Sequence, residues 1–380
     1  MPKIARIPIT NVFMQGDYTG RILVGPHQTP MNVILDTGSS ALALSGHKYK
    51  VDVAHGDQTT NLAQTDSYGD GSSWTGAVLH TSVAIGDGAS QIVFPGANVA
   101  VAYQESSDMF PKVDGILGLA YAALDDAYQM PGATWPKHYS STQVQQGTAT
   151  TIVPYLTQLA GQDVVSDKVS FDTLRSFIHE GGGDPAQDPL NKGWMIVGGG
   201  EESTDLYSGA FQTVKVLTDD WYSTNLKAVI VGSKTPIHVP VRGPKGMSTN
   251  SIVDSGTNTL CLGPKLLNAL IAKFTPAQQA QLNASVFQDQ VLHAADLNLS
   301  TWPDITFVLQ GETADVSLRV APADYWQVNA PKAGAAMAAI TPNEDESAIL
   351  GLPLMSGYFT IFDGEADGGK GAIKFATSKR

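Results

Sequence analysis

The chain has 380 residues, of which 42% are hydrophobic and 16% charged, and this is enough apolar material for a large buried core. Acidic residues number 36 against 23 lysines and arginines, so the net charge is −13 at pH 7, and a surface of this sign repels the phosphate backbone of nucleic acids. No apolar run approaches the roughly 18 residues that a membrane span requires, so we expect neither nucleic acid nor a membrane as a partner.

The turn-forming residues indicate the fold class. Thirty-eight glycines and 21 prolines separate many short runs of valine, isoleucine and threonine. This pattern predicts an all-β protein with many turns and only a few short helices.

In the first part of the chain, an apolar run at residues 33–35 leads directly into an aspartate and a polar turn. The turn consists of Asp36, Thr37, Gly38 and Ser39. We expect a buried strand that ends in a turn so tight that glycine is required.

The middle of the chain is less regular. We expect residues 122–147 to form a polar, irregular surface loop, at the rim of any substrate site. The apolar spacing at residues 151–159 predicts a helix, and the glycines at 181–183 predict a loop before a strand at 194–197.

Three consecutive glycines at 198–200 mark the expected boundary between two lobes, residues 1–200 and 201–380. The alternative interpretation is a phosphate-binding loop. No Lys-Ser or Lys-Thr pair follows these glycines and no helix is predicted there, so we favour the boundary.

The second half contains a second aspartate turn. Residues 251–253 are again β-forming, and they lead into Asp254, Ser255, Gly256 and Thr257.

Further elements are expected around this turn. They are strands near 221–222 and 228–231, a helix at 264–271 with proline in its first turn, and a strand at 372–376. Cys261, the only cysteine, lies in an apolar run and is expected to be a small buried residue, and no intrachain disulfide can form.

Each aspartate turn is followed at a similar distance by two aliphatic residues and a glycine, at 116–118 and at 349–351. Two copies of one such unit predict two similar lobes with an approximate two-fold axis. The two carboxylates are then expected to meet on this axis.

With these motifs the chain resembles the pepsin-like aspartic proteases along nearly its whole length. Residues 68–73 are similar to the flap hairpin of that family, residues 114–121 to the segment behind the first catalytic turn, and residues 302–307 and 349–363 to strands of the second lobe. The resemblance implies a bilobal, mostly β fold with pseudo-two-fold symmetry, in which the two chain ends join one sheet between the lobes.

The chemistry of such a pair depends on two close carboxylates that share one proton, for which aspartic proteases are the established example. Asp36 and Asp254 are therefore the expected catalytic residues, and they would activate water without a covalent intermediate. The resemblance implies that the outer carboxylate oxygens bind the hydroxyl groups of Ser39 and Thr257. It also implies that Thr37 and Ser255 bind across to the opposite backbone, and that the amides of Gly38 and Gly256 approach the inner oxygens.

The resemblance also assigns substrate-binding residues. Tyr68 would close over the substrate, with flexibility from Gly69, and Ile116 and Ile349 would contact the substrate. Asp70 resembles the flap aspartate of fungal members and would favour a basic residue at the cleavage site; the alternative is a solvated turn aspartate.

Two positions depart from the family pattern. Ala43 stands where a tryptophan usually orders the flap tyrosine, so Tyr68 needs another partner or is more mobile. Trp74 is a candidate substitute, although we favour its packing on the hairpin. Leu352 stands where an aspartate is usual, which predicts a modest upward shift of the pH optimum.

The expected activity is that of an aspartic endopeptidase that cleaves extended chains at acidic pH, between bulky hydrophobic residues. Its expected partners are polypeptide substrates and statine-type peptide inhibitors, and we expect a monomer without a cofactor. The eight histidines show no pair at helical metal-ligand spacing, so no metal site is predicted. The alternatives are a weakly active or inactive pepsin-fold protein that binds peptides or acts as an inhibitor, and a glycosidase with paired carboxylates.

The N-terminal residues predict the location. Residues 1–9 lack the apolar core of a signal peptide, and residues 20–25 already resemble the first strand of a mature enzyme. Together with the absence of disulfides, this pattern is similar to the bacterial pepsin homologues, which have no signal peptide or prosegment. We therefore expect a cytoplasmic protein; the alternative is a periplasmic or secreted one, if the chain is a trimmed mature form.

Overall fold

The computed structural model describes residues 2–107, 109–240 and 249–380. The strands of the first half are β1 (Ala5–Met14), β2 (Asp17–Val24), β3 (Thr29–Asp36), β4 (Leu42–Ser45), β5 (Gln58–Ser67), β6 (Ser73–Ile85), β7 (Ile92–Glu105), β8 (Gly115–Gly118), β9 (Asp126–Gln129), β10 (Thr148–Thr151), β11 (Lys168–Asp172) and β12 (Lys192–Val197).

The strands of the second half are shorter on average. They are β13 (Tyr207–Lys215), β14 (Ser223–Thr224), β15 (Leu226–Val231), β16 (Ile237–His238), β17 (Ser251–Val253), β18 (Leu260–Leu262), β19 (Leu292–His293), β20 (Ile305–Leu309), β21 (Val316–Val320), β22 (Trp326–Val328), β23 (Ala335–Ala338), β24 (Ile340–Pro342), β25 (Ala348–Leu350), β26 (Tyr358–Asp363) and β27 (Ala372–Ser378).

The helices are short. They are α1 (Ser141–Gln145), α2 (Tyr155–Ala160), α3 (Pro264–Ile271), α4 (Pro276–Phe287), α5 (Pro322–Tyr325), α6 (Leu352–Met355) and α7 (Ala366–Gly369). Single 3-10 turns lie at η1 (Gly88–Ser90), η2 (Ala122–Leu124), η3 (Pro185–Gln187), η4 (Pro189–Asn191), η5 (Ala294–Asp296) and η6 (Leu299–Thr301). Within the described ranges, no helix is long and apolar enough to cross a membrane.

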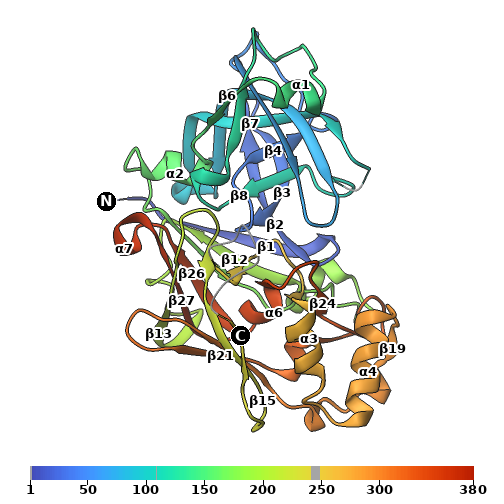
Figure 1. Cartoon of the computed structure of the whole chain (residues 1–380). Coiled ribbons are helices and arrows are strands. Elements are labelled where there is room, and N and C mark those ends of the chain that lie inside the picture. The colour runs from blue at the N-terminus through green and yellow to red at the C-terminus, as the bar shows by residue number, and fades with distance from the viewer. Residues whose placement is uncertain (1, 108, 241–248) are drawn as a thin grey trace.

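One 15-stranded sheet runs through both lobes, in the order β10-β9-β5-β6-β7-β4-β8-β3-β2-β1-β12-β11-β26-β27-β13. Strands from the two chain ends meet in it, since β1 and β26 are separated only by β12 and β11 (Figure 1). The expected sheet between the lobes is therefore present. The division of the chain at residue 200 stays a prediction, because this sheet is continuous across it.

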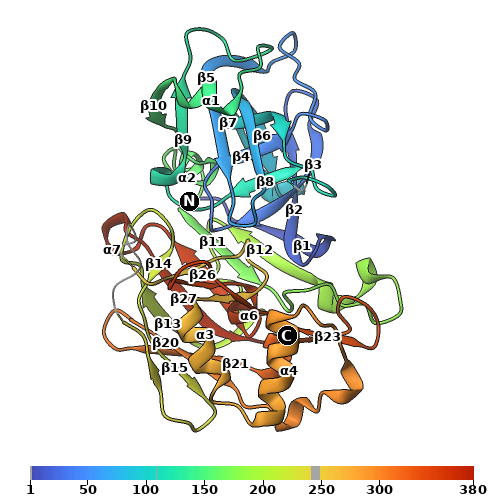
Figure 2. The same ribbon diagram turned by 45° about the vertical axis from the view of Figure 1, so that its right-hand side comes forward.

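In the described residues of the second half there are also three smaller sheets, in the orders β14-β17-β25-β18-β24, β16-β15-β20-β21 and β19-β23-β22. Helices α3 and α4 lie on the outside of this lobe, and α4 packs against β23 and β24 (Figure 2). The mostly β, bilobal fold class that the sequence predicted is thus confirmed.

The core joins the lobes through aromatic contacts. The ring of Phe362 meets the rings of Tyr222 and Phe171 edge-on, at centroid distances of 4.7 and 6.0 Å, and all three residues are buried. Full burial of one large apolar side chain is worth about 1.5–3 kcal/mol, so this contact holds β26 firmly against β11.

Several local predictions are confirmed and others are wrong. The helix that begins with Pro264 is present as α3, and the last strand as β27. The helix predicted over 151–159 begins only at Tyr155, because Pro154 holds the residue before it out of the helical region. Residues 122–147 are not wholly irregular, since they contain α1 and β9, and β9 pairs with β5 and β10.

Candidate active site

Each aspartate turn follows a strand that pairs in parallel with the strand of the Ile-Leu-Gly unit in the same lobe. β3 pairs with β8, so that Ile34 lies opposite Ile116, and β17 pairs with β25, so that Ile252 lies opposite Ile349. The glycine of each unit passes closely behind the turn. A Cβ atom on Gly118 would lie 2.4 Å from the carbonyl carbon of Ser40, and one on Gly351 would lie 2.1 Å from the carbonyl oxygen of Thr257. Only glycine permits these crossings.

The two carboxylates are held in equivalent ways by their own turns. Asp36 is 5% exposed, and it accepts hydrogen bonds from the Gly38 amide at 2.7 Å and from the Ser39 hydroxyl at 2.5 Å. Asp254 is 7% exposed, and it accepts bonds from the Gly256 amide at 2.8 Å and from the Thr257 hydroxyl at 2.6 Å. Each carboxylate therefore has one oxygen bound by an amide and the other bound by a hydroxyl group.

The residue that follows each aspartate, Thr37 or Ser255, forms hydrogen bonds with the turn of the other lobe. The Thr37 amide donates to the Ser255 hydroxyl at 3.0 Å, and the Ser255 amide donates to the Thr37 hydroxyl at 2.9 Å. The Ser255 hydroxyl then donates to the carbonyl oxygen of Leu35 at 2.8 Å, and the Thr37 hydroxyl to that of Val253 at 3.4 Å. These buried bonds fix the two turns relative to each other.

The carboxylates face each other across the two turn glycines. A Cβ atom on Gly38 would lie 2.7 Å from Oδ1 of Asp254, and one on Gly256 would lie 2.3 Å from Oδ1 of Asp36. Each carboxylate thus packs against the backbone of the opposite turn, where a side chain cannot fit.

This arrangement changes the acidity of the pair. Burial raises the pKa of Asp36 well above its ordinary value, and the charge of Asp254 raises it further, against the hydrogen bonds from Ser39 and Gly38. Of two carboxyl groups this close, one keeps its proton while the other is ionised. The pair can then act as general acid and general base at the same time.

The flap is the hairpin of β5 and β6. Its turn is closed by hydrogen bonds from the Tyr68 amide to the carbonyl oxygen of Ser72 and from the Gly71 amide to that of Tyr68, both at 2.9 Å. Gly71 has a φ of +85°, a conformation that favours glycine. At Gly69, no heavy atom lies within 4 Å of the Cβ position, so the tip of the flap is open.

Tyr68 lies over the first catalytic turn. Burial raises the pKa of its phenol, the charges of Asp66 and Asp36 raise it further, and hydrogen bonds with Trp74 and Ser39 oppose this rise. Its ring packs beside the small apolar cluster that contains Ile116, which is 4% exposed. Ile349 is partly exposed on β25 of the other lobe.

Asp70 is exposed at the flap tip, and its Oδ1 accepts bonds from the amide and the hydroxyl of Ser72, at 2.8 and 2.7 Å. Leu352 and Ala43, the two departures from the family pattern, are fully buried. The Leu352 amide donates to the carbonyl oxygen of Thr257 at 2.8 Å, so Leu352 lies directly beside the second catalytic turn.

Three further residues of the site were not predicted. The Trp221 indole donates to the carbonyl oxygen of Gly38 at 3.0 Å, and the Asn258 side chain donates to that of Gln15 at 3.3 Å. Burial raises the pKa of Asp17 to about 8, and the charges of Asp254 and Asp70 raise it further, so Asp17 belongs to the acidic surroundings of the second aspartate. The residues of each contact are far apart in sequence, and no local pattern marks them.

Comparison with known proteins gives a consistent result. The family model of the eukaryotic aspartyl proteases matches residues 17–148 and 186–377. The chain is 25% identical to pepsin A of Gallus gallus over 376 residues, which is 94% of this chain and 83% of that protein. It is 24% identical to the vacuolar aspartic protease of Candida albicans over 394 aligned positions, which cover 98% of this chain and 77% of the relative.

The match to chymosin of Camelus dromedarius is 30% identical over 142 residues, and it spans only 34% of this chain and 36% of the chymosin. The family model, in contrast, covers most of the chain and includes both aspartate turns. The chain therefore belongs to the eukaryotic aspartyl protease family, the pepsin-like aspartic peptidases.

Proposed function

We propose that the protein is an aspartic endopeptidase in which Asp36 and Asp254 activate water to hydrolyse peptide bonds. The main support for this proposal is the position of the two carboxylates, each of which packs against the glycine of the opposite turn. Family membership supports the same reaction type.

The proposed reaction needs one ionised and one protonated carboxyl group. The ionised group takes a proton from water while the protonated group donates its proton to the carbonyl oxygen of the substrate. The water oxygen bonds to the carbonyl carbon and forms a neutral tetrahedral diol. The carboxyl group that took the proton from water then donates it to the amide nitrogen, while the other carboxylate takes a proton from a diol hydroxyl group. The carbon–nitrogen bond breaks, and a carboxylic acid and an amine leave.

The supporting residues keep this geometry during the reaction. The hydroxyl groups of Ser39 and Thr257 and the amides of Gly38 and Gly256 bind the four carboxylate oxygens of the two buried aspartates. A dyad that is fixed before the substrate binds needs little reorganisation in the transition state.

We propose an extended peptide as substrate, with bulky hydrophobic residues at the cleaved bond. The flap can add strand-like hydrogen bonds to such a peptide. The apolar cluster of Ile116 and its neighbours under Tyr68 supports a preference for hydrophobic side chains on that side of the cleft. A statine-type peptide, whose hydroxyl group mimics the diol, should bind tightly. Both aspartates come from one chain, which supports a monomer.

We also propose an acidic pH optimum, since the reaction requires a shared proton on the dyad. The presence of a single cysteine, Cys261, excludes an intrachain disulfide and supports a location in the cytoplasm. Fractionation of the source cells checks the location, and recovery of the protein outside the cytoplasm would contradict it.

The decisive experiment is cleavage of a denatured protein and a peptide library between about pH 3 and pH 7. Wild type is compared with Asp36→Asn and Asp254→Asn, and with wild type in the presence of a statine-type peptide. Activity that falls toward neutral pH and is lost in both variants and with the inhibitor supports the proposal. A folded wild type that binds the inhibitor but cleaves nothing at any pH would instead indicate a peptide-binding protein.

A further inference from the structure

Three side chains with metal-ligating atoms meet on the surface of the first lobe, outside the candidate active site. They are His27, Asp52 and His55, and their ligating atoms all lie within 4.8 Å of one another. His27 belongs to the turn between β2 and β3, and the other two belong to the loop between β4 and β5. In the part of the chain that the structure describes, this is the only group of three or more His, Cys, Asp or Glu residues with such spacing.

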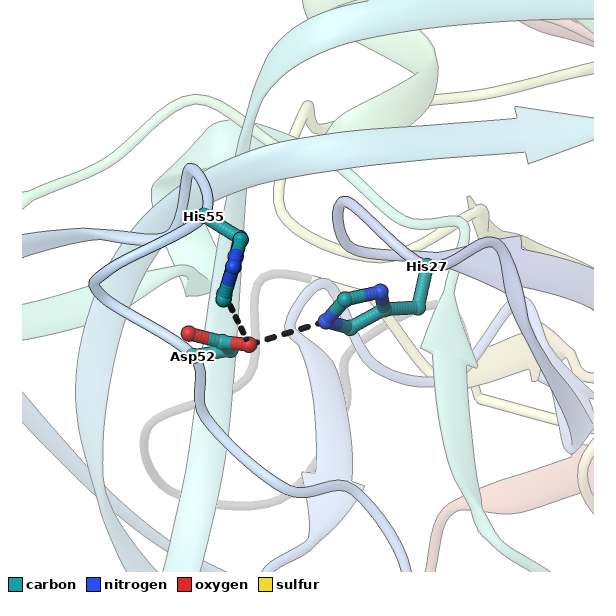
Figure 3. A group of neighbouring side chains, drawn as sticks. All are labelled: His27, Asp52 and His55. Carbon is teal, nitrogen blue, oxygen red and sulfur yellow. Dashed lines mark hydrogen bonds and ion pairs between the residues drawn. The ribbon is translucent and has the colours of Figure 1, made fainter.

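Both imidazole rings point toward the same carboxylate (Figure 3). Nε2 of His27 lies 2.8 Å from Oδ2 of Asp52, and Nδ1 of His55 lies 2.7 Å from the same oxygen. The two ring centroids are 5.5 Å apart and tilted by 56°. Two ring nitrogens from two separate loops thus lie beside one carboxylate oxygen.

The two loops are fixed by contacts that do not involve the histidines. Asp57 is 1% exposed, and it accepts hydrogen bonds from the Tyr49 hydroxyl at 2.8 Å, from the Thr81 hydroxyl at 2.5 Å and from the Asp52 amide at 2.8 Å. The Tyr49 hydroxyl in turn lies directly beneath Gly25, where a Cβ atom would approach it to 2.1 Å. Buried contacts therefore hold the turn that carries His27 beside the loop that carries Asp52 and His55.

The donor set matches a particular class of ion. Two imidazoles and one carboxylate suit Zn²⁺ and the later divalent transition metals, whereas Mg²⁺ and Ca²⁺ prefer oxygen ligands alone. The side chains of His27 and His55 are 60% and 65% exposed, so water can complete the coordination.

We propose that His27, Asp52 and His55 form a binding site for one divalent transition-metal ion, which links the turn after β2 to the loop before β5. An ion held in this way adds a link between two segments of the first lobe and stabilises the folded state, because the unfolded chain does not bring the three ligands together. The site shares no residue with the dyad, so this proposal does not depend on the proposed function.

The test is calorimetric titration of tag-free, metal-stripped protein with Zn²⁺ at pH 7.5, where an ordinary imidazole is largely neutral. We expect one equivalent to bind, no binding of Mg²⁺ or Ca²⁺, and a d–d absorption band when Co²⁺ is used instead. The melting temperature should rise with the Zn²⁺ concentration.

Matched variants locate the ion. His27→Ala and His55→Ala should each weaken Zn²⁺ binding by at least about tenfold, whereas His293→Ala, an exposed histidine of the second half, should bind as wild type does. The melting temperatures of the metal-free variants confirm that they are folded. Absence of stoichiometric Zn²⁺ binding by wild type would overturn the proposal and leave Asp52 as a carboxylate bound only by two histidines. Equal Zn²⁺ affinities of His27→Ala, His55→Ala and wild type would also overturn it.

Discussion

The indole N–H of Trp74 donates a hydrogen bond to the phenol oxygen of Tyr68, with 3.1 Å between Nε1 and the hydroxyl oxygen. Trp74 is 1% exposed and belongs to the same apolar cluster as Ala43, which stands where the family usually has the tryptophan that orders the flap. Trp74, on β6, therefore positions the flap tyrosine in this protein. The interpretation that it only packs on the hairpin was incomplete.

The first prediction concerns this bond. Trp74→Phe keeps an aromatic ring but removes the donor, and we expect kcat/KM to fall about three- to tenfold, in line with the loss of one neutral hydrogen bond. Tyr68→Phe serves as the second arm of a double-mutant cycle. If Trp74→Phe lowers kcat/KM equally in the wild-type and Tyr68→Phe backgrounds, the bond is not the cause.

The second prediction concerns the contact between the two lobes at Gly256. A Cβ atom there would lie 2.3 Å from Oδ1 of Asp36, so Gly256→Ala must displace the carboxylate. Because displacements of about 1 Å at reacting groups can lower rates about 100-fold, we expect a loss of kcat of at least this size. Gly96→Ala, on β7, has no heavy atom within 4 Å of its Cβ position and is the matched control. Similar kcat values for the two variants would contradict the face-to-face geometry.

The third prediction concerns Leu352, which is fully buried beside the second turn. A carboxyl group in its place would be kept protonated by burial, could donate a hydrogen bond toward the Asp254 turn and would favour the ionised form of the dyad. We therefore expect Leu352→Asp to move the pH optimum down by about one unit or less, and Leu352→Met, which conserves volume, to leave it unchanged. Equal pH optima for Leu352→Asp and wild type would count against this role.

The fourth prediction concerns Asp70 and substrate preference. We expect Asp70→Asn to lower kcat/KM for a peptide with lysine at the cleaved bond about two- to fivefold relative to a norleucine peptide, the range expected for one exposed charge pair. The control is Asp87→Asn, at an exposed aspartate directly before the η1 turn. If wild type cleaves the lysine peptide no better than Asp70→Asn does, Asp70 is only a turn residue that binds Ser72.

The fifth prediction concerns stability and pH. Burial raises the pKa of Asp17 to about 8, of Asp125 to about 7, and of Asp167 and Asp324 to about 6, from an ordinary value of 3.8. Above pH 3.8 the unfolded chain loses protons that the native state keeps, so the native state binds more protons. The free energy of unfolding should therefore decrease as the pH rises from about 4 to 8.

We expect this decrease to be at least about 1.4 kcal/mol, the equivalent of one pKa unit on a single group. Urea unfolding at each pH measures it. Asp125→Asn, at a position that is 2% exposed, should flatten the slope between pH 4 and pH 7. A free energy of unfolding that rises over this range would show that these carboxyl groups ionise readily in the native state. Glu201 contributes to the free energy of unfolding with the opposite sign. Lys374 and Lys168 lower its pKa to about 2, so the stabilisation that its ionised form provides is lost only as the pH falls below about 4.5.

The sequence predicted those parts of the molecule whose conformation depends on residues that are close together in the chain. The aspartate turns, the glycines behind them and α3 each follow from a short pattern, since an aliphatic run with Asp, a hydroxyl residue and Gly has few local conformations. The β elements at 126–129 and 148–151 were missed because they form through pairing with β5 and with each other, not through strong local propensity.

Contacts between distant segments could not be predicted. Trp221 and Gly38 are 183 positions apart, and nothing near Trp221 indicates its partner. The two histidines of the cluster, His27 and His55, lie in different loops and are far apart in the sequence, so a search for histidine pairs on a helix could not find it. Its members converge because Asp57 and Tyr49 fix two loops, which is a property of the folded lobe.

Gly38 packs against Asp254, and Gly256 packs against Asp36. The same contact is thus made twice, once in each direction between the two lobes. Symmetric dimers have interfaces of this kind, where one surface satisfies both partners. A single lobe with one Asp-Thr-Gly turn would therefore meet the steric requirement of the dyad by pairing with its own copy. In the present chain the same requirement keeps a glycine in both turns, at Gly38 and Gly256, although the two turns differ at the preceding residues, Thr37 and Ser255.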